Sequence, residues 1–128
     1  MPNALIIPAQ DTQLTQQAKL DEMLAPWAQA LALRVSAQEL AENSAQSYKR
    51  GARRFISFCQ ELELDPTAPD SVREWKAELL KEYKPATVNA WLAGLKALYT
   101  WLAEQGRLSF NPAQNVKGAK RKGTSKRH

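Results

Sequence analysis

The sequence has very little cysteine or histidine: one cysteine, Cys59, and one histidine, His128, at the end of the 128 residues. A single cysteine cannot form an internal disulfide, and these two residues cannot form the ligand cluster of a structural metal. We therefore expect no metal or other cofactor and a protein of a reducing cytoplasm. Cys59 falls among apolar positions, which predicts a small buried side chain rather than a reactive thiol.

Long apolar runs are also absent. No stretch approaches the roughly 20 apolar residues that a bilayer-spanning helix needs, and the short run Leu5–Ile7 is stopped at once by Pro8. No segment alternates apolar and polar residues as a half-buried strand does. A membrane protein and a β-rich protein are therefore excluded, and a chain of this length suits one globular domain.

Positive charge is unevenly distributed. The formal net charge is +5, but six of the 18 basic residues lie in the last 12 positions, which contain no acid. Removing these six leaves 12 basic and 13 acidic residues, so the rest of the chain is nearly neutral. Attraction to a polyanion must therefore come from local patches. The tail is one such patch, and the acid-free stretch 43–60 is the other.

Helical spacing of apolar residues recurs four times and predicts an all-α, four-helix bundle. The first helix is expected over about 19–34, where Pro26 either kinks it or marks its start. A second helix is expected over 43–62, and a third begins with a capping box formed by Ser71 and Glu74. The fourth opens at Pro85 and stops at Gly106.

The second predicted helix has one apolar and one basic face. Its basic face has no acids to form pairs along the helix, although most charge runs are simply solvated surfaces. It contains Gln46, Lys49, Arg50, Arg53, Arg54 and Ser57. The fourth helix has instead a face of small residues, which reflects either the helix propensity of alanine or a close approach to DNA or to another protomer. This face consists of Ala90, Ala93, Gly94 and Ala97.

Three motifs together resemble the N-terminal SAM-like domain of phage integrases and Xer-type tyrosine recombinases. They are the run AENSAQSYKR at 41–50 followed by Phe55 and Phe58, the run KPATVN at 84–89 leading into LKALYTWL at 95–102, and the Asn111-Pro112 pair. The resemblance covers about residues 20 to 116. Two features depart from the family pattern: Ser44 replaces a frequent threonine, and Asn89 lies where an arginine is common.

The resemblance implies an orthogonal, SAM-like DNA-clamping domain over 19–116 and a basic linker at 117–128. Residues 1–18 are rich in Gln, Thr and Pro without helical spacing, and we expect them to form a flexible arm. It implies double-stranded DNA as partner, a monomeric fragment that self-associates only within a full-length recombinase tetramer on DNA, and a bacterial or phage-encoded origin. The parent enzyme would be a tyrosine recombinase, but this chain lacks the catalytic domain and is not itself an enzyme. The residues expected to contact DNA are Ser44, Gln46, Ser47, Lys49, Arg50, Arg53, Arg54, Lys84, Thr87, Asn89, Lys96, Lys117, Lys120, Arg121 and Lys122.

Two other classes of function remain as alternatives. Small helical bundles share their core pattern with protein-interaction modules such as SAM or death-like domains, so a helical protein–protein interaction module with a basic tail is the first rival. An enzyme is the second, but the sequence offers no nucleophile with a base and no metal cluster. The basic tail could also be only a solubilising end. Binding whose affinity changes with neither salt concentration nor the presence of nucleic acid would favour the interaction module.

Overall fold

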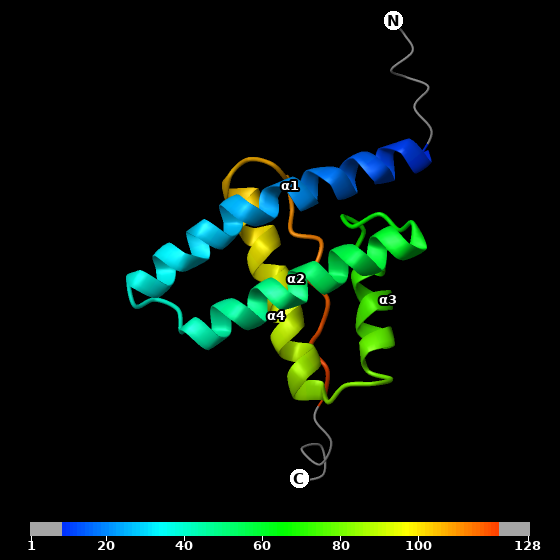
Figure 1. Ribbon diagram of the computed structural model, residues 1–128. Helices are drawn as coiled ribbons and strands as arrows, with labels where there is room; N and C mark the ends of the chain where they lie inside the picture. The colour runs from blue at the N-terminus through cyan, green and yellow to red at the C-terminus, as the bar shows by residue number, and fades with distance from the viewer. Residues whose placement is uncertain (1–8, 121–128) are drawn as a thin grey trace, which may run out of the picture.

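Four helices form the protein in the computed structural model, which describes the backbone of residues 9–120 and the side chains of 20–120. They are α1 (Ala9–Ser36), α2 (Glu42–Leu62), α3 (Pro69–Leu79) and α4 (Pro85–Glu104). The described chain contains no strand. In Figure 1, α1 and α2 run across the molecule, while α3 and α4 run steeply to them. The predicted all-α, four-helix architecture is therefore confirmed.

The first helix is longer than predicted. It begins at Ala9, so residues 9–18, expected in the loose arm, form its first turns, and it continues through Pro26. Buried Leu20, Trp27 and Leu31 fix the helix against the bundle. Once a helix has formed its first turns, each further residue adds a hydrogen bond at little cost, which favours continuation of the helix towards Ala9. Residues 1–8 of the predicted arm lie outside the described residues.

The start of α3 differs from the prediction. The helix begins at Pro69 with Ala68 at its N-cap and no side-chain cap, so the Ser71–Glu74 capping box is wrong. Proline has a fixed φ and no N–H to satisfy, and it therefore starts a helix two residues before Ser71. Ser71 is buried instead. The preceding turn is held by Asp65, whose carboxylate accepts hydrogen bonds from the Thr67 amide at 2.9 Å and hydroxyl at 2.7 Å.

Both predicted ends of α4 are confirmed. Pro85 lies in its first turn, and the helix ends at Glu104. Gly106 follows with a φ of 76°, a left-handed conformation that glycine adopts without strain. These two residues fix the length of α4, which crosses the middle of the bundle behind α2 in Figure 1.

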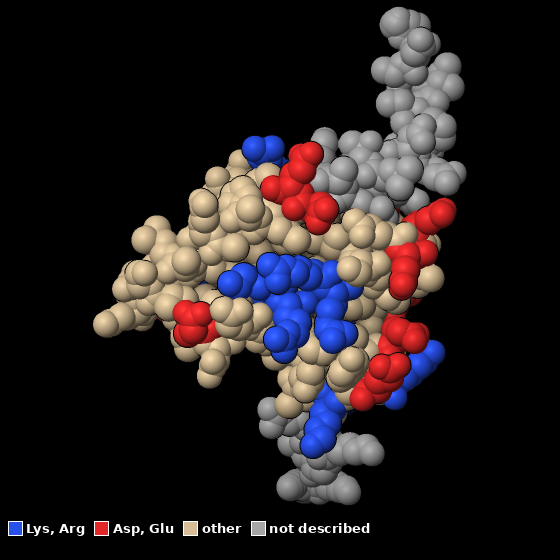
Figure 2. Space-filling model, viewed as in Figure 1, with Lys and Arg blue, Asp and Glu red and all other residues tan. Residues whose placement is uncertain are grey.

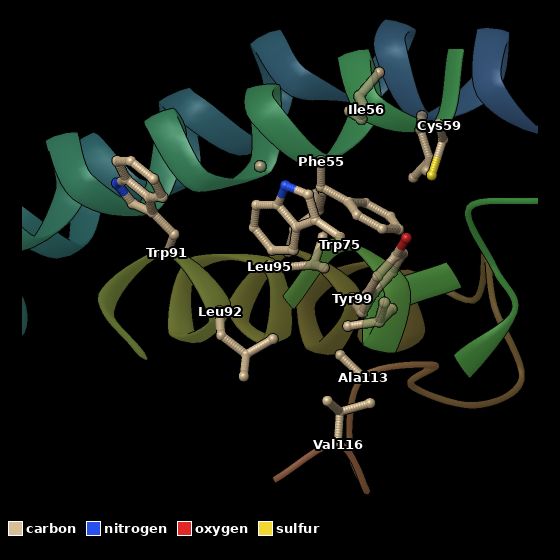
Figure 3. Packing of buried hydrophobic residues seen from close by; sticks show 14 of the residues in the cluster. Phe55, Ile56, Cys59, Trp75, Trp91, Leu92, Leu95, Tyr99, Ala113 and Val116 are labelled. Atoms are coloured by element: carbon tan, nitrogen blue, oxygen red, sulfur yellow. The ribbon is translucent and has the colours of Figure 1, made fainter. Parts of the chain in front are cut away.

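Aromatic rings fill the centre of the core. Phe55 packs edge-to-face against Trp75, with ring centroids 5.3 Å apart, and against Tyr99 at 6.4 Å. All three are buried, and Figure 3 shows them meeting between α2, α3 and α4. The Tyr99 hydroxyl donates a hydrogen bond to the Pro66 carbonyl, so the polar end of this buried ring is satisfied.

The helices α2 and α4 cross with their backbones in direct contact. A Cβ atom added to Gly51 would lie 2.5 Å from the Trp91 carbonyl oxygen, and one added to Gly94 would lie 2.6 Å from that of Tyr48. Real Cβ atoms do not approach so closely, so both positions require glycine. This contact accounts for Gly94 in the small-residue face of α4: it serves the crossing with α2, not an approach to DNA or to another protomer.

The chain after α4 returns along the bundle as a segment that is neither helix nor strand and that begins with a turn at 112–115. We call residues 111–119 the strap; in Figure 1 it runs beside α4 towards the start of that helix. Ala113 and Val116 of the strap are buried in the core, and Figure 3 shows them below Tyr99 and Leu92. The Asn111 side chain donates to the Lys96 carbonyl at 3.2 Å and to the Thr100 hydroxyl at 3.0 Å. The strap is therefore part of the folded domain.

Candidate nucleic-acid interface

The basic residues of α2 gather on one exposed surface. We call Lys49, Arg50, Arg53 and Arg54 the α2 cationic face; Figure 2 shows a continuous cluster of basic residues at the centre of the molecule, over α2. Opposite lies the apolar face, from which Ala52, Phe55, Ile56 and Cys59 enter the core. Because the core fixes the rotation of α2 about its axis, the cationic face must point to solvent.

The cations of this face are not neutralised by neighbouring acids. Among the described residues, ion pairs join Arg73 to Asp70 at 3.0 Å and Lys81 to Glu78 at 3.2 Å, both within the α3 region. The α2 cationic face takes part in neither pair. Acids occur at its border, where Glu61, Glu78 and Glu82 line a groove between α2 and α3 that also includes Arg53 and Arg54. The surface is thus positive with an acidic edge.

Arg54 differs from the other three cations because it is held in place by aromatic rings. Its guanidinium carbon lies 4.4 Å from the centroid of the Trp91 ring and 5.5 Å from that of Tyr83. It also donates a hydrogen bond to the Tyr83 hydroxyl at 3.4 Å. The two rings pack edge-to-face at 4.9 Å. Arg54 therefore links α2 to the start of α4, and its charge faces solvent with a restricted orientation.

Three polar residues expected to contact DNA lie at the N-terminal end of α2. Gln46 is exposed, and its amide donates to the Glu42 carboxylate at 3.0 Å. Ser44 and Ser47 are half-buried. Helix α2 has Ala41 at its N-cap and no side-chain cap, so Ser44 does not cap this helix. Of these three residues, Gln46 presents the most accessible polar group.

The residues predicted on α4 do not form one group. Lys84 is exposed at the N-cap and Thr87 is half-buried nearby, whereas Lys96 lines a groove between α1 and α4 together with Arg34 and Tyr48. Thr87 makes no capping bond, since α4 has no side-chain cap. Arg34, in the last turn of α1, was not among the residues predicted to contact DNA.

Asn89 has a partner within the protein. Its side-chain amide donates to the Ala119 carbonyl at 3.0 Å, and its side-chain oxygen accepts from the Ala119 amide at 2.6 Å. Lys76 likewise donates to the Lys117 carbonyl at 2.7 Å. Lys117 and Lys120 are exposed, while Arg121 and Lys122 lie outside the described residues. The predicted contact set therefore includes one residue, Asn89, whose side chain is occupied by the strap.

Two groups with shifted pKa values, Cys59 and Tyr99, are buried. Burial raises the pKa of the Cys59 thiol to about 12, with Asp65 and Glu74 adding smaller effects. Burial also raises the pKa of Tyr99 well above its ordinary value, with smaller effects from Cys59 and Asp65. Both groups stay protonated at neutral pH. In the described part of the chain no three His, Cys, Asp or Glu residues are grouped so that they could hold a metal ion.

Comparison with protein families identifies the class of this domain. The family described as "Phage integrase, N-terminal SAM-like domain" matches residues 17–106, which include all of α2, α3 and α4 and most of α1. The chain belongs to this family, and its role is therefore related to that of the tyrosine recombinases. Neither a search of curated proteins nor one of solved structures finds a match. None of the described helices is long and apolar enough to cross a membrane.

Proposed function

We propose that this domain binds double-stranded DNA and that the α2 cationic face is its principal contact surface. The observation that carries the proposal is the α2 cationic face (Figure 2), whose three arginines are exposed and whose Lys49 is half-buried, with no ion pair among the described residues. It lies in a chain that belongs to the phage integrase family. Phosphates are the most numerous protein contacts on a duplex, and Lys and Arg are the residues that neutralise them.

Within this surface the residues have different parts. Arg50 and Arg53 are exposed and have no ion-pair partner among the described residues, so they are available for phosphates or for a guanine edge. Gln46, further along the same side of α2, has an amide that could read an adenine. Arg54 presents one edge to the surface while its face packs on Trp91. Lys84 and Thr87, at the start of α4, would extend the contact along the phosphate backbone.

The domain would act as one half of a clamp. A tyrosine recombinase cuts and rejoins DNA through a 3′-phosphotyrosine on a separate catalytic domain, and we assign no step of that reaction to this chain. Its contribution would be affinity, orientation on the duplex and contacts between protomers in a recombinase tetramer. Since half of a clamp lacks the contacts of the other half, the isolated domain should be monomeric and should bind weakly and with little sequence preference.

The test is a titration of a fluorescently labelled duplex with the protein at several salt concentrations, in which fluorescence anisotropy measures binding. If three or four phosphates are neutralised, log Kd should rise with log salt with a slope of roughly three. A triple variant, Lys49→Gln, Arg50→Gln and Arg53→Gln, should lose most of the affinity. The matched control replaces three exposed cations elsewhere, Arg73, Lys81 and Arg107, by Gln; it has the same net charge and should bind like the original protein.

Two outcomes would contradict the proposal. If the domain does not bind duplex DNA even at low salt, DNA binding is wrong, and the protein-interaction module becomes the better reading. If both triple variants lose affinity equally, only overall charge matters and the α2 cationic face is not the contact surface. Melting curves of each variant must match that of the original protein, so that loss of binding is not loss of folding.

A further inference from the structure

A groove with an apolar floor lies between the C-terminal half of α2 and α3. Two hollows form it, and they are continuous because Phe58, Glu61 and Glu78 line both. One hollow reaches the α2 cationic face, and the other reaches Leu62, of which 54% is exposed. Phe58 and Leu62 are one turn apart on α2, so their side chains are neighbours on the same face of the helix. Together they give the groove an apolar surface that is open to solvent.

Acids border this apolar surface. Glu61 comes from α2, Glu74 and Glu78 come from α3, and Glu82 follows α3 in the chain. Figure 2 shows acidic residues gathered on the right of the view, over α3 and the C-terminal end of α2. Lys81 pairs with Glu78 at 3.2 Å, whereas the other three glutamates take part in no ion pair among the described residues. The groove is therefore apolar inside and negatively charged at its border.

Neither feature is used by the fold of the domain. The core under the groove is formed by Trp75 and Leu79, which are buried. Glu74 and Glu78 are four residues apart on α3, a spacing at which like charges repel and destabilise a helix. Leu62 leaves apolar area in water instead of burying it. Both costs are relieved together by one kind of ligand, which has cations for the glutamates and apolar side chains for the floor.

We propose that the groove binds a cationic amphipathic helix of a partner protein. The apolar residues of this helix lie on Phe58 and Leu62, while its Lys or Arg residues lie beside Glu61, Glu74 and Glu78. A groove between two helices is a common receptor for such a helix, because apolar residues at three-and-four spacing all point into it. Complementary charge selects the partner and its register. The proposal does not depend on the proposed DNA binding.

The same chemistry disfavours other classes of occupant. The glutamates repel nucleic acid and an anionic membrane surface. A second copy of the chain lacks the required pattern, because in the described chain the α2 cationic face has no exposed large apolar residue among its cations. A duplex on that face would likewise be kept out of the groove, which stays open to a protein.

The experiment uses the full chain and a synthetic peptide, without DNA, because a cationic peptide itself binds a duplex. The peptide has about 18 residues, with Leu at three-and-four spacing and Lys at the other positions. Isothermal titration calorimetry should show binding that weakens as salt is added and that has a negative heat-capacity change, which marks apolar burial. A scrambled peptide of the same composition and a peptide with Glu in place of Lys should not bind.

Variants of the acids test the border of the groove. Replacement of Glu61, Glu74 and Glu78 by Gln should weaken peptide binding roughly tenfold or more. The melting temperature of this variant should be no lower than that of the original protein, because the repulsion along α3 is removed. The matched control changes three exposed acids outside the groove: Asp21→Asn, Glu39→Gln and Glu104→Gln. It has the same net charge as the groove variant and should bind like the original protein.

A second pair of variants tests the apolar floor. Leu62→Ser removes the exposed apolar side chain from the groove and should weaken peptide binding roughly tenfold. Leu33→Ser makes the same change on α1, where Leu33 is 70% exposed and lies outside the groove, and it should leave binding unchanged. Since both leucines are exposed, neither change should lower the melting temperature appreciably.

Several results would overturn the proposal. If the original protein does not bind the peptide at low salt, the groove is not a receptor for a cationic helix. If the two acid variants lose affinity equally, only overall charge matters. If Leu62→Ser and Leu33→Ser bind equally well, the apolar floor makes no contact. If light scattering shows self-association that the groove variants abolish, the occupant is a second copy of the chain. None of these results depends on DNA binding, which the duplex titration tests separately.

Discussion

Gly94 of α4 lies so close to Tyr48 of α2 that a Cβ on the glycine would be 2.6 Å from the tyrosine carbonyl oxygen. The relation is reciprocal, because Gly51 of α2 has the same kind of contact with Trp91 of α4. On α2, Gly51 is three residues from Tyr48, and on α4, Gly94 is three residues from Trp91. The two backbones are therefore in contact over about one helical turn. This crossing sets the position of the α2 cationic face relative to the start of α4.

Gly94→Ala should destabilise the domain by at least about 2 kcal/mol, because the atoms that block the new methyl group belong to backbone and cannot rotate away. The gain in helix propensity, about 1 kcal/mol, is smaller. Urea unfolding followed by circular dichroism measures the change. Gly106→Ala is the control: its φ of 76° strains alanine, but nothing lies within 4 Å, so it should cost only about 1 kcal/mol. Equal costs would contradict the close crossing.

Arg53 and Arg54 are neighbours with different surroundings, so their alanine variants should fail differently. Arg53→Ala removes an exposed cation and should weaken duplex binding by roughly 1 to 3 kcal/mol while leaving stability within about 0.5 kcal/mol. Arg54→Ala also removes the stacking on Trp91 and Tyr83, and should lower the free energy of unfolding by about 1 kcal/mol. Duplex titration and urea unfolding of each variant test this. An Arg54→Ala protein as stable as the original would show that the stacking contributes nothing.

Phe55→Ala should cost about 3 to 5 kcal/mol of stability, since it opens a cavity between the rings of Trp75 and Tyr99. Its loss of DNA binding should follow the unfolded fraction and disappear under conditions where the variant is folded. Thermal melting with parallel binding measurements tests this. Weak binding by a fully folded Phe55→Ala protein would mean that the residue supports the interface in some other way.

Cys59 should react slowly in the native protein, because its raised pKa of about 12 leaves very little thiolate at pH 8. Alkylation by iodoacetamide should be on the order of 1000-fold slower than in urea, where the pKa returns to its ordinary range. The same shift makes stability depend on pH. Above pH 9 the unfolded thiol ionises while the folded one stays protonated, so the free energy of unfolding should fall as the pH rises from about 9 towards 12. Rapid alkylation of the folded protein would contradict this burial.

The residues in these four predictions fall into two groups: those that hold the fold and those that face solvent. Arg54 belongs to both groups, and a single sequence could not show this, because its aromatic partners lie 29 and 37 positions away.

The sequence by itself determined the helical class and the two faces of α2, because periodic spacing of apolar residues is a local property that burial then enforces. It also determined the ends of α4, since proline and glycine act on their own backbone. The close contact at Gly51 was not predicted. A glycine inside so regular a helix is nevertheless a signal of close packing, because helix propensity alone disfavours glycine there. The predicted start of α3 at Ser71 was wrong because two helix-start signals lie close together: the capping pattern of Ser71 and Glu74, and Pro69 just before it.

Only the tertiary structure decided which long-range partners the polar residues have. Asn89 has an ordinary place on a polar face of α4, and nothing near it in the chain indicates that Ala119, thirty residues later, occupies its amide. The strap has no periodicity of its own, so its course depends on the core that buries Ala113 and Val116 and on its hydrogen-bond partners on α3 and α4. Periodicity specifies which face of a helix is buried, but the pairing of distant polar groups depends on how the helices cross, and here two glycines determine that crossing.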